Sequence, residues 1–171
     1  MTGSALGPGG EFDLIRSLAA RWQERARGIG DDVAALDLPA GERVVASTDV
    51  SVENVHFRRE WLTPREIGYR ATAAALSDLA AAAAAPLGIL VAITLPESWR
   101  ASATAIADGI GDAAGDAETH IVGGDTSAGT ELALAITVLG HAASPLQRGG
   151  ARTGDALYVT GRLGGPFAAL R

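Results

Sequence analysis

The sequence predicts a mixed α/β (α+β) fold built on a partly antiparallel sheet. Apolar residues recur at helical spacing in three segments, and five short runs are rich in apolar and β-branched residues. Two of those runs are joined by "GGDTSAGTE", which is too short to carry a helical crossover between parallel strands. The chain has 171 residues, enough for one domain with its own hydrophobic core.

The first predicted elements are a helix over 11–26 and a strand over 43–48. Apolar side chains repeat at helical spacing through the first segment: Phe12, Ile15, Leu18, Ala19 and Trp22. The acidic glycine loop "GIGDD" at 28–32 ends that pattern, and "RVVAST" then has the composition of a strand. We therefore expect this strand to end where "STDVSVENVHF" begins to be polar.

A second helix is predicted from "TPRE" up to Pro86. Thr63 can cap it, Pro64 suits the first helical position, and Glu66 can close a capping box. The rest of the chain predicts a third helix over 98–114 and four more strands, at 87–96, 120–125, 131–140 and 155–161.

The composition excludes several classes of protein. A net charge of −6 argues against a nucleic-acid partner held by phosphate neutralisation. The absence of cysteine excludes disulfides, cysteine nucleophiles and thiolate metal sites. The N-terminus lacks the basic and apolar regions of a signal peptide, and Pro86 and Gly88 split the uncharged stretch 79–96. We expect a soluble, cytoplasmic protein.

Acidic residues recur just after apolar or glycine-containing segments: Asp31, Asp32, Asp49, Asp78 and Asp125. Carboxylate and hydroxyl oxygens are hard ligands that suit Mg²⁺, and neither an EF-hand nor a P-loop spacing occurs. Asp78 stands inside an otherwise uncharged helix. It is either a buried carboxylate that needs a partner or a metal, or an exposed position or local cap to Ser77.

The remaining polar candidates each have two readings. Gly123 and Gly124 can let backbone amides approach a phosphate while Asp125 holds a metal, or they can form a turn between two strands. His56 is either a ligand or, as is more common for a histidine on its own, a structural or exposed imidazole. Arg148 is either a phosphate clamp or a solvated side chain in a glycine loop.

Five motifs, in this order, resemble the N-terminal half of the thiamine-monophosphate kinase family: "GIGDDVAAL", "STDVSVENVHF", "IGYRATAAALSDLAA", "IVGGDTSAG" and "RGGARTGDALYVTGRLGG". That family belongs to the superfamily of aminoimidazole ribonucleotide synthetase and selenophosphate synthetase. The resemblance covers residue 11 to the end of the chain. It implies helices on one face of the sheet and a homodimer in which two sheets pair into a barrel.

The resemblance implies a role for each matching residue. It places Mg²⁺ ions on oxygen ligands, ATP on the glycine motif and the arginine, and thiamine monophosphate against the histidine. The implied metal ligands are Asp31, Ser47, Thr48, Asp49, Asp78 and Asp125; the nucleotide contacts are Gly124, Asp125 and Arg148; the substrate contact is His56. Glu53 receives no metal role. No residue is implied as general acid or base, because several Mg²⁺ ions would bring the two polyanions together.

The implied domains are a flexible N-terminus (1–10), the ATP- and Mg²⁺-binding domain (11–161) and the start of a truncated C-terminal domain (162–171). The chain departs from the family in two ways: Asp116 and Ala117 stand where a nucleotide-contacting tyrosine is usual, and the C-terminal domain is missing. Transfer of phosphate from ATP to thiamine monophosphate is the first hypothesis. The alternatives are a non-catalytic nucleotide-binding or dimerisation fragment, and a related ATP-dependent synthetase.

Overall fold

The fold is described from a computed structural model, which covers residues 9–30, 32–159 and 161. The described residues form three α-helices, four strands and three short 3-10 helices. In order they are α1 (Gly10–Trp22), η1 (Gln23–Arg25), β1 (Arg43–Val52), α2 (Pro64–Ala81), β2 (Ala85–Leu95), η2 (Glu97–Ser102), α3 (Ala103–Asp116), β3 (Ile121–Ala128), β4 (Ala133–Ala142) and η3 (Arg148–Gly150).

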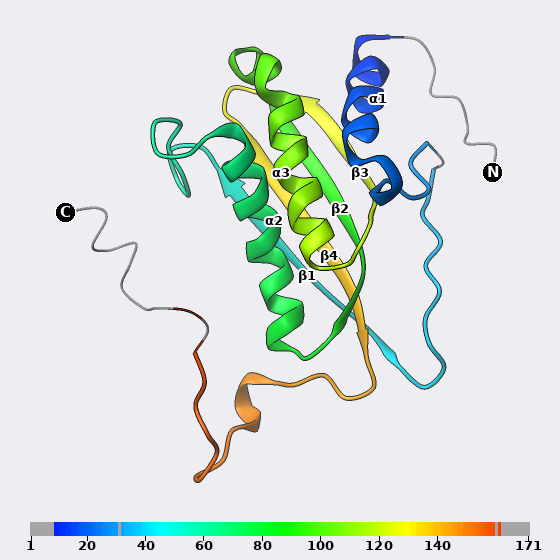
Figure 1. Ribbon diagram of the computed structural model, residues 1–171, viewed down its shortest axis with the longest axis vertical. Helices are drawn as coiled ribbons and strands as arrows, with labels where there is room; N and C mark the ends of the chain where they lie inside the picture. The colour runs from blue at the N-terminus through cyan, green and yellow to red at the C-terminus, as the bar shows by residue number, and fades with distance from the viewer. Residues whose placement is uncertain (1–8, 31, 160, 162–171) are drawn as a thin grey trace.

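The four strands form one mixed sheet in the order β1-β4-β2-β3. β4 pairs antiparallel with both β1 and β2, while β2 and β3 pair in parallel, so the predicted mixed, partly antiparallel sheet is confirmed. Figure 1 shows α1, α2 and α3 on the same side of this sheet. β1 and β3 are therefore the two edges of the sheet, and one of its faces carries the helix layer.

Alternation along the strands separates a core face from an open face. On β4, Leu134, Ile136 and Val138 are fully buried under the helices, whereas the residues between them are only half-buried. Paired residues across a sheet share a face, so the half-buried positions of β2 and β4 lie together on the face opposite the helices. In the described part of the chain, no helix covers that open face.

α2 begins as its sequence predicts and packs closely on α3. The hydroxyl of Thr63 accepts from the Glu66 N–H, and the Glu66 carboxylate accepts from the Thr63 N–H, which completes the predicted capping box. Glycine lies on both sides of the crossing. A Cβ on Gly68 would lie 2.1 Å from the Ile106 carbonyl oxygen, and one on Gly109 would lie 1.9 Å from that of Arg65.

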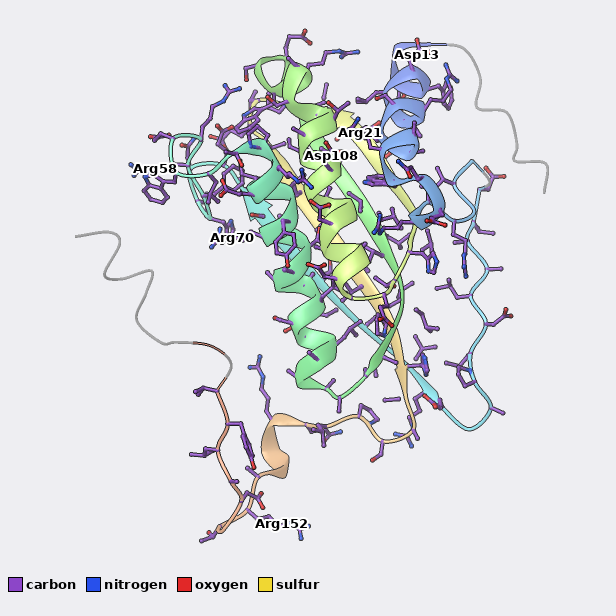
Figure 2. All side chains as sticks on the ribbon, viewed as in Figure 1. Asp13, Arg21, Arg58, Arg70, Asp108 and Arg152 are labelled. Atoms are coloured by element: carbon purple, nitrogen blue, oxygen red, sulfur yellow. The ribbon has the colours of Figure 1, made fainter. Side chains whose placement is uncertain are left out.

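Three aspartates one turn apart on α3 tie the helix layer together. Arg21 on α1 donates from Nε and Nη2 to the Asp108 carboxylate, each at 2.6 Å, and this lowers the pKa of that carboxyl. Figure 2 labels Arg21 and Asp108 side by side. The two remaining partners are on α2: Arg65 donates to Asp112 at 2.6 Å, and the Tyr69 hydroxyl donates to Asp116 at 2.9 Å. This bond raises the pKa of Tyr69.

Three strand predictions need correction. β1 runs to Val52 rather than ending near residue 48, because its second half stays paired with β4. The 120–125 strand runs on to Ala128, so its glycines lie inside the strand. No strand forms at 155–159 or 161, where the described residues have no neighbouring strand to pair with and Leu157 and Tyr158 are exposed.

The helix predictions hold with small shifts at their ends. α1 ends at Trp22, and the third helix begins as η2 before α3. α2 ends at Ala81 rather than running up to Pro86, which lies in β2. The predicted segment 162–171 and residues 1–8 lie outside the described residues. Among the helices of the described chain, none is both long enough and apolar enough to cross a membrane.

We expect Gly109→Ala to destabilise the fold by about 1–3 kcal/mol, because the added methyl group forces α2 and α3 apart. Urea unfolding followed by circular dichroism measures the change. Gly149→Ala is the matched control, since a Cβ there meets open space within 4 Å. Equal stability of the two variants would contradict the close crossing.

Candidate functional site

Adjacent residues of β1 point to opposite faces of the sheet. Ser47 lies on the helix face, where its Oγ donates to Oδ2 of Asp78 on α2 at 2.5 Å. Thr48 lies on the open face, where its hydroxyl is 3.0 Å from that of Thr137 on β4. Asp49 returns to the Ser47 face, because side chains alternate along a strand. The strand therefore divides the predicted metal ligands between two faces.

Asp78 is exposed, although it stands in an alanine-rich helix. The reading of Asp78 as a buried carboxylate is thus wrong. The local cap to Ser77 is also absent, because the Ser77 hydroxyl bonds the Ala74 carbonyl instead. The partner of Asp78 is Ser47, which is distant in sequence and comes from the sheet. The helix presents this carboxylate to the side of β1.

A groove between β1 and α2, which we call the β1–α2 groove, holds several of the predicted residues. Its volume is about 630 Å³, and its polar lining includes Ser47, Asp78, Arg148 and Asp155. The structure thus brings two predicted metal ligands and a predicted nucleotide contact into one groove. Asp155 was not predicted; its carboxylate also accepts from the Arg152 N–H and closes a turn.

A larger groove lies on the open face of the sheet, and we call it the open-face groove. Its volume is about 840 Å³, within the usual range for a small-molecule site. The "GIGDD" loop supplies one wall through Gly28, Gly30 and Asp32, and β3 supplies Gly124 and Asp125. Asp31, the metal ligand implied in that loop, lies outside the described residues.

Asp125 and Asp49 are not brought together within one copy of the chain. Asp125 is on β3 and Asp49 is on β1, with β4 and β2 between them, so the two strands are about 14 Å apart. Across the described residues, no three acidic or histidine side chains are close enough to hold a metal ion. The metal ligands implied by the resemblance therefore form at least two separate groups here.

Gly124 has a structural reason to be glycine. It is paired with Val91 of β2, and a Cβ would lie only 1.9 Å from the Val91 carbonyl oxygen. The alternative of a turn between two strands is excluded, since Gly124 lies within β3. Close packing of two backbones accounts for this glycine without any ligand.

His56 is exposed on the segment between β1 and α2, which we call the 53–62 loop. The Val52 N–H donates to its Nδ1 at 3.1 Å, and Arg70 on α2 donates to its carbonyl oxygen at 2.9 Å. Arg70 was not singled out from the sequence. Its spacing of 14 residues from His56 carries no local signal that the two meet.

Glu53 anchors the same loop. Its Oε2 accepts from the Trp99 indole N–H at 2.8 Å and from the Leu132 N–H at 3.4 Å. Phe57 is buried with its ring edge-on to Trp99, at 6.5 Å between centroids. The loop that carries His56 is thus fixed to η2 and to the turn before β4.

The position of the missing tyrosine is the end of α3. Asp116 is the last residue of that helix, and its carboxylate accepts from the Tyr69 hydroxyl. Here the residue joins two helices rather than facing either groove.

The donor set of the β1–α2 groove fits Mg²⁺ in its chemistry. Asp78 and Ser47 line the groove, and Asp49 lies on the same face of β1, so together they offer carboxylate and hydroxyl oxygens. Mg²⁺ is usually held by one or two carboxylates together with substrate phosphates and water. The exposure of Asp78 leaves its carboxylate open to such a ligand. These three residues are the ones on the helix face that could hold the ion.

Comparison with known proteins gives a consistent set of relatives. Residues 30–142 match the family described as AIR synthase related protein, N-terminal domain. The chain is similar to a thiamine-monophosphate kinase of Rhodopirellula baltica, with 40% identity over 160 residues that cover 88% of this chain and 51% of the relative. The chain spans about half the length of the curated relatives it matches.

Solved structures give the same picture. The fold is similar to that of a thiamine-monophosphate kinase from Stenotrophomonas maltophilia K279a, with a TM-score of 0.65 and 38% identity over 78% of this chain and 42% of that chain. It is also similar to a structure described as "AaThiL complexed with AMPPCP and TMP". There the TM-score is 0.60 and the identity 28%, over 84% of this chain and 45% of that chain.

We expect Gly124→Ala to lower the thermal stability of the chain in the absence of any nucleotide, because its methyl group collides with the backbone of β2. Differential scanning calorimetry measures the shift. Gly123→Ala serves as the control, since its Cβ would be 3.1 Å from the mobile tip of the Leu90 side chain. If Gly124→Ala unfolded at the same midpoint temperature as the unmodified chain, the close approach of Gly124 to the β2 backbone would have no role in stability.

Proposed function

The chain belongs to the AIR synthase related protein family, and from that membership we propose that it is the ATP- and Mg²⁺-binding half of a thiamine-monophosphate kinase. The enzyme would be a phosphotransferase that uses ATP to convert thiamine monophosphate to thiamine diphosphate. Its acceptor would therefore be a phosphate group. We place the protein in the cytoplasm, as expected for a biosynthetic enzyme without a membrane-spanning helix in its described part.

One observation carries this proposal most directly: Asp78 and Ser47 meet across α2 and β1 in the same groove as Arg148. Carboxylate and hydroxyl oxygens beside a guanidinium suit a complex of Mg²⁺ with a polyphosphate. Relatives of 34–40% identity are named thiamine-monophosphate kinase, and one similar structure is described as a complex with AMPPCP and TMP. These names support ATP and thiamine monophosphate as the two substrates.

The roles follow from the chemistry of the residues. Asp49, Asp78 and Ser47 would hold Mg²⁺ on the helix face, while Thr48 and Asp125 would serve further ions on the open face. Asp31 would be a further metal ligand, as the resemblance implies. Bound Mg²⁺ supplies charge neutralisation between two anions that otherwise repel each other. Arg148 and Gly124 would bind the nucleotide, and His56 would bind the thiamine phosphate. No general base is needed, since the acceptor oxygen already carries negative charge.

Dimerisation through the open face of the sheet is part of the proposal. The open face is largely apolar, with Val50, Leu90 and Leu139 on it, and its groove is bordered by Phe12 and Ile15 of α1 and by the "GIGDD" loop. Among the described residues, the outer edges of β1 and β3 have no neighbouring strand. A second copy would cover this face and shield the edges, which otherwise promote aggregation. It would also give Asp125 and Thr48 new neighbours.

We expect the chain to bind Mg-ATP in isothermal calorimetry, and we expect Asp49→Asn or Asp78→Asn to weaken that binding at least tenfold, or about 1.4 kcal/mol. The reason is the loss of a carboxylate ligand from the metal. Glu24→Gln is the control, because Glu24 is exposed on η1 away from both grooves.

Mg-ATP binding that is unchanged by both Asp49→Asn and Asp78→Asn would refute the proposed metal–nucleotide site. Binding of ATP with no effect of thiamine monophosphate on ADP release, even in a protein that includes the rest of the relatives' length, would favour the non-catalytic nucleotide-binding fragment. Turnover stimulated instead by formylglycinamidine ribonucleotide would favour the related synthetase.

A charge placed on the open face should separate the two copies. We expect Leu139→Lys or Val50→Lys to shift the chain from dimer to monomer in sedimentation velocity, because a lysine would be buried in an apolar contact. Val55→Lys changes an exposed valine away from the sheet and should leave the dimer intact. A monomeric unmodified chain would refute pairing through this face.

A further inference from the structure

Arg70 lies beside His56 and makes one hydrogen bond to it. Among the described residues, that bond leaves most N–H donors of the Arg70 guanidinium without a partner. Its guanidinium donates from Nη1 to the His56 carbonyl oxygen at 2.9 Å. A guanidinium carries five N–H groups in a planar fork, and a carbonyl does not neutralise its charge. Arg70 is exposed on α2. A full positive charge and several donors therefore face solvent next to His56.

The neighbouring arginines have other partners. Arg65 forms an ion pair with Asp112, Arg59 stacks over the Trp99 ring at 4.1 Å and donates to the Ser98 carbonyl, and Arg58 stacks over the exposed Trp61 ring at 5.0 Å. Figure 2 places Arg58 and Arg70 at the side of the molecule where the 53–62 loop meets α2. Of these four arginines, Arg70 is the one bonded to the residue that bears the exposed imidazole.

The hydrogen bond made by the His56 ring determines which of its two nitrogens donates. Since the Val52 N–H donates to Nδ1, that nitrogen is an acceptor, and the neutral ring carries its proton on Nε2. The backbone beneath it is fixed, because Glu53 holds the loop through Trp99 and Leu132. The structure thus offers a charged donor on α2 and a neutral donor on a positioned loop, and the bond from Arg70 to the His56 carbonyl oxygen joins the two residues.

Arg70 and Asp78 lie on the same helix, eight positions apart, which is about 12 Å along its axis. Both reach toward β1: Asp78 bonds Ser47 within the strand, and Arg70 bonds the loop that leaves its end. One end of the β1–α2 contact is therefore acidic and the other basic. An anion that carries a bound metal ion would therefore be attracted at both ends: its metal by Asp78, and its own negative charge by Arg70.

We infer that Arg70 and His56 form a phosphate-binding subsite that takes the phosphomonoester group of the acceptor substrate. The identity of that acceptor rests on the function proposed above, whereas the affinity for a phosphate group does not. Arg70 is then a substrate-binding residue in its own right, and Glu53 is a positioning residue that keeps the His56 loop in place.

The test titrates the chain with inorganic phosphate and follows the His56 ring and the Arg70 side-chain signals by ¹H–¹⁵N NMR. We expect saturable shifts at both groups. Arg70→Gln should weaken phosphate binding at least tenfold, since a charge-assisted contact is lost, while Arg58→Gln should change it less than twofold. Arg70→Lys keeps the charge and should fall between them, and it serves if Arg70→Gln does not fold.

Equal effects of Arg70→Gln and Arg58→Gln, or no response of His56 to phosphate, would overturn the subsite. A parallel titration with thiamine monophosphate and with thiamine separates this inference from the proposed function. Phosphate binding that depends on Arg70, without a preference for thiamine monophosphate over inorganic phosphate, supports the subsite but not the kinase. Tight binding of thiamine monophosphate that ignores Arg70 supports the kinase and rejects the subsite.

Discussion

The close crossing of α2 and α3 is the contact on which the helix layer depends. Gly68 and Gly109 let each helix touch the other's backbone, so the crossing has no room for even a methyl group. This contact, with the aspartates of α3 bonded to α1 and α2, fixes where α2 lies over the sheet. The meeting of Asp78 and Ser47 follows from that placement, because one comes from α2 and the other from β1. The site is thus a consequence of how two helices pack.

Much of the fold could be predicted from the sequence, because helical periodicity and capping are local signals. "TPRE" specified the start of α2 correctly, and the alternation in 131–140 identified β4. The ends of β1 and β3 could not be predicted, since polar residues and glycines usually terminate strands. Here pairing with β4 extends β1 through Asp49, and close contact with β2 requires the glycine of β3. The 155–161 segment has strand composition but no partner in the described chain.

The order of the motifs pointed to the family, and the family match agrees with it. The site residues stay a prediction, and only Ser47, Asp78 and Arg148 of that set share the β1–α2 groove. Which face each residue occupies depends on strand register and on α2, so the sequence could not show that Ser47 and Thr48 diverge. Arg70 was missed, and Glu53 was named without its anchoring contacts, because their partners are distant in sequence. Those partners are a carbonyl, an indole and an amide, none of which leaves a motif.

The pairing of β1 with β4 also governs which changes in length the chain can accept. β1 is an edge strand held by ten consecutive pairs, from Arg43 with Ala142 to Val52 with Ala133. Because side chains alternate, a slip of one residue would turn Thr48 and Val50 toward α2 and Asp49 away from it. If a single residue were inserted in or deleted from β4 and the pairing with β1 slipped by one, Asp49 would leave the helix face although Asp49 itself was unchanged. The register therefore limits changes of length within the two strands, while the loop after β1 can vary only as far as the bonds of Glu53 and His56 allow.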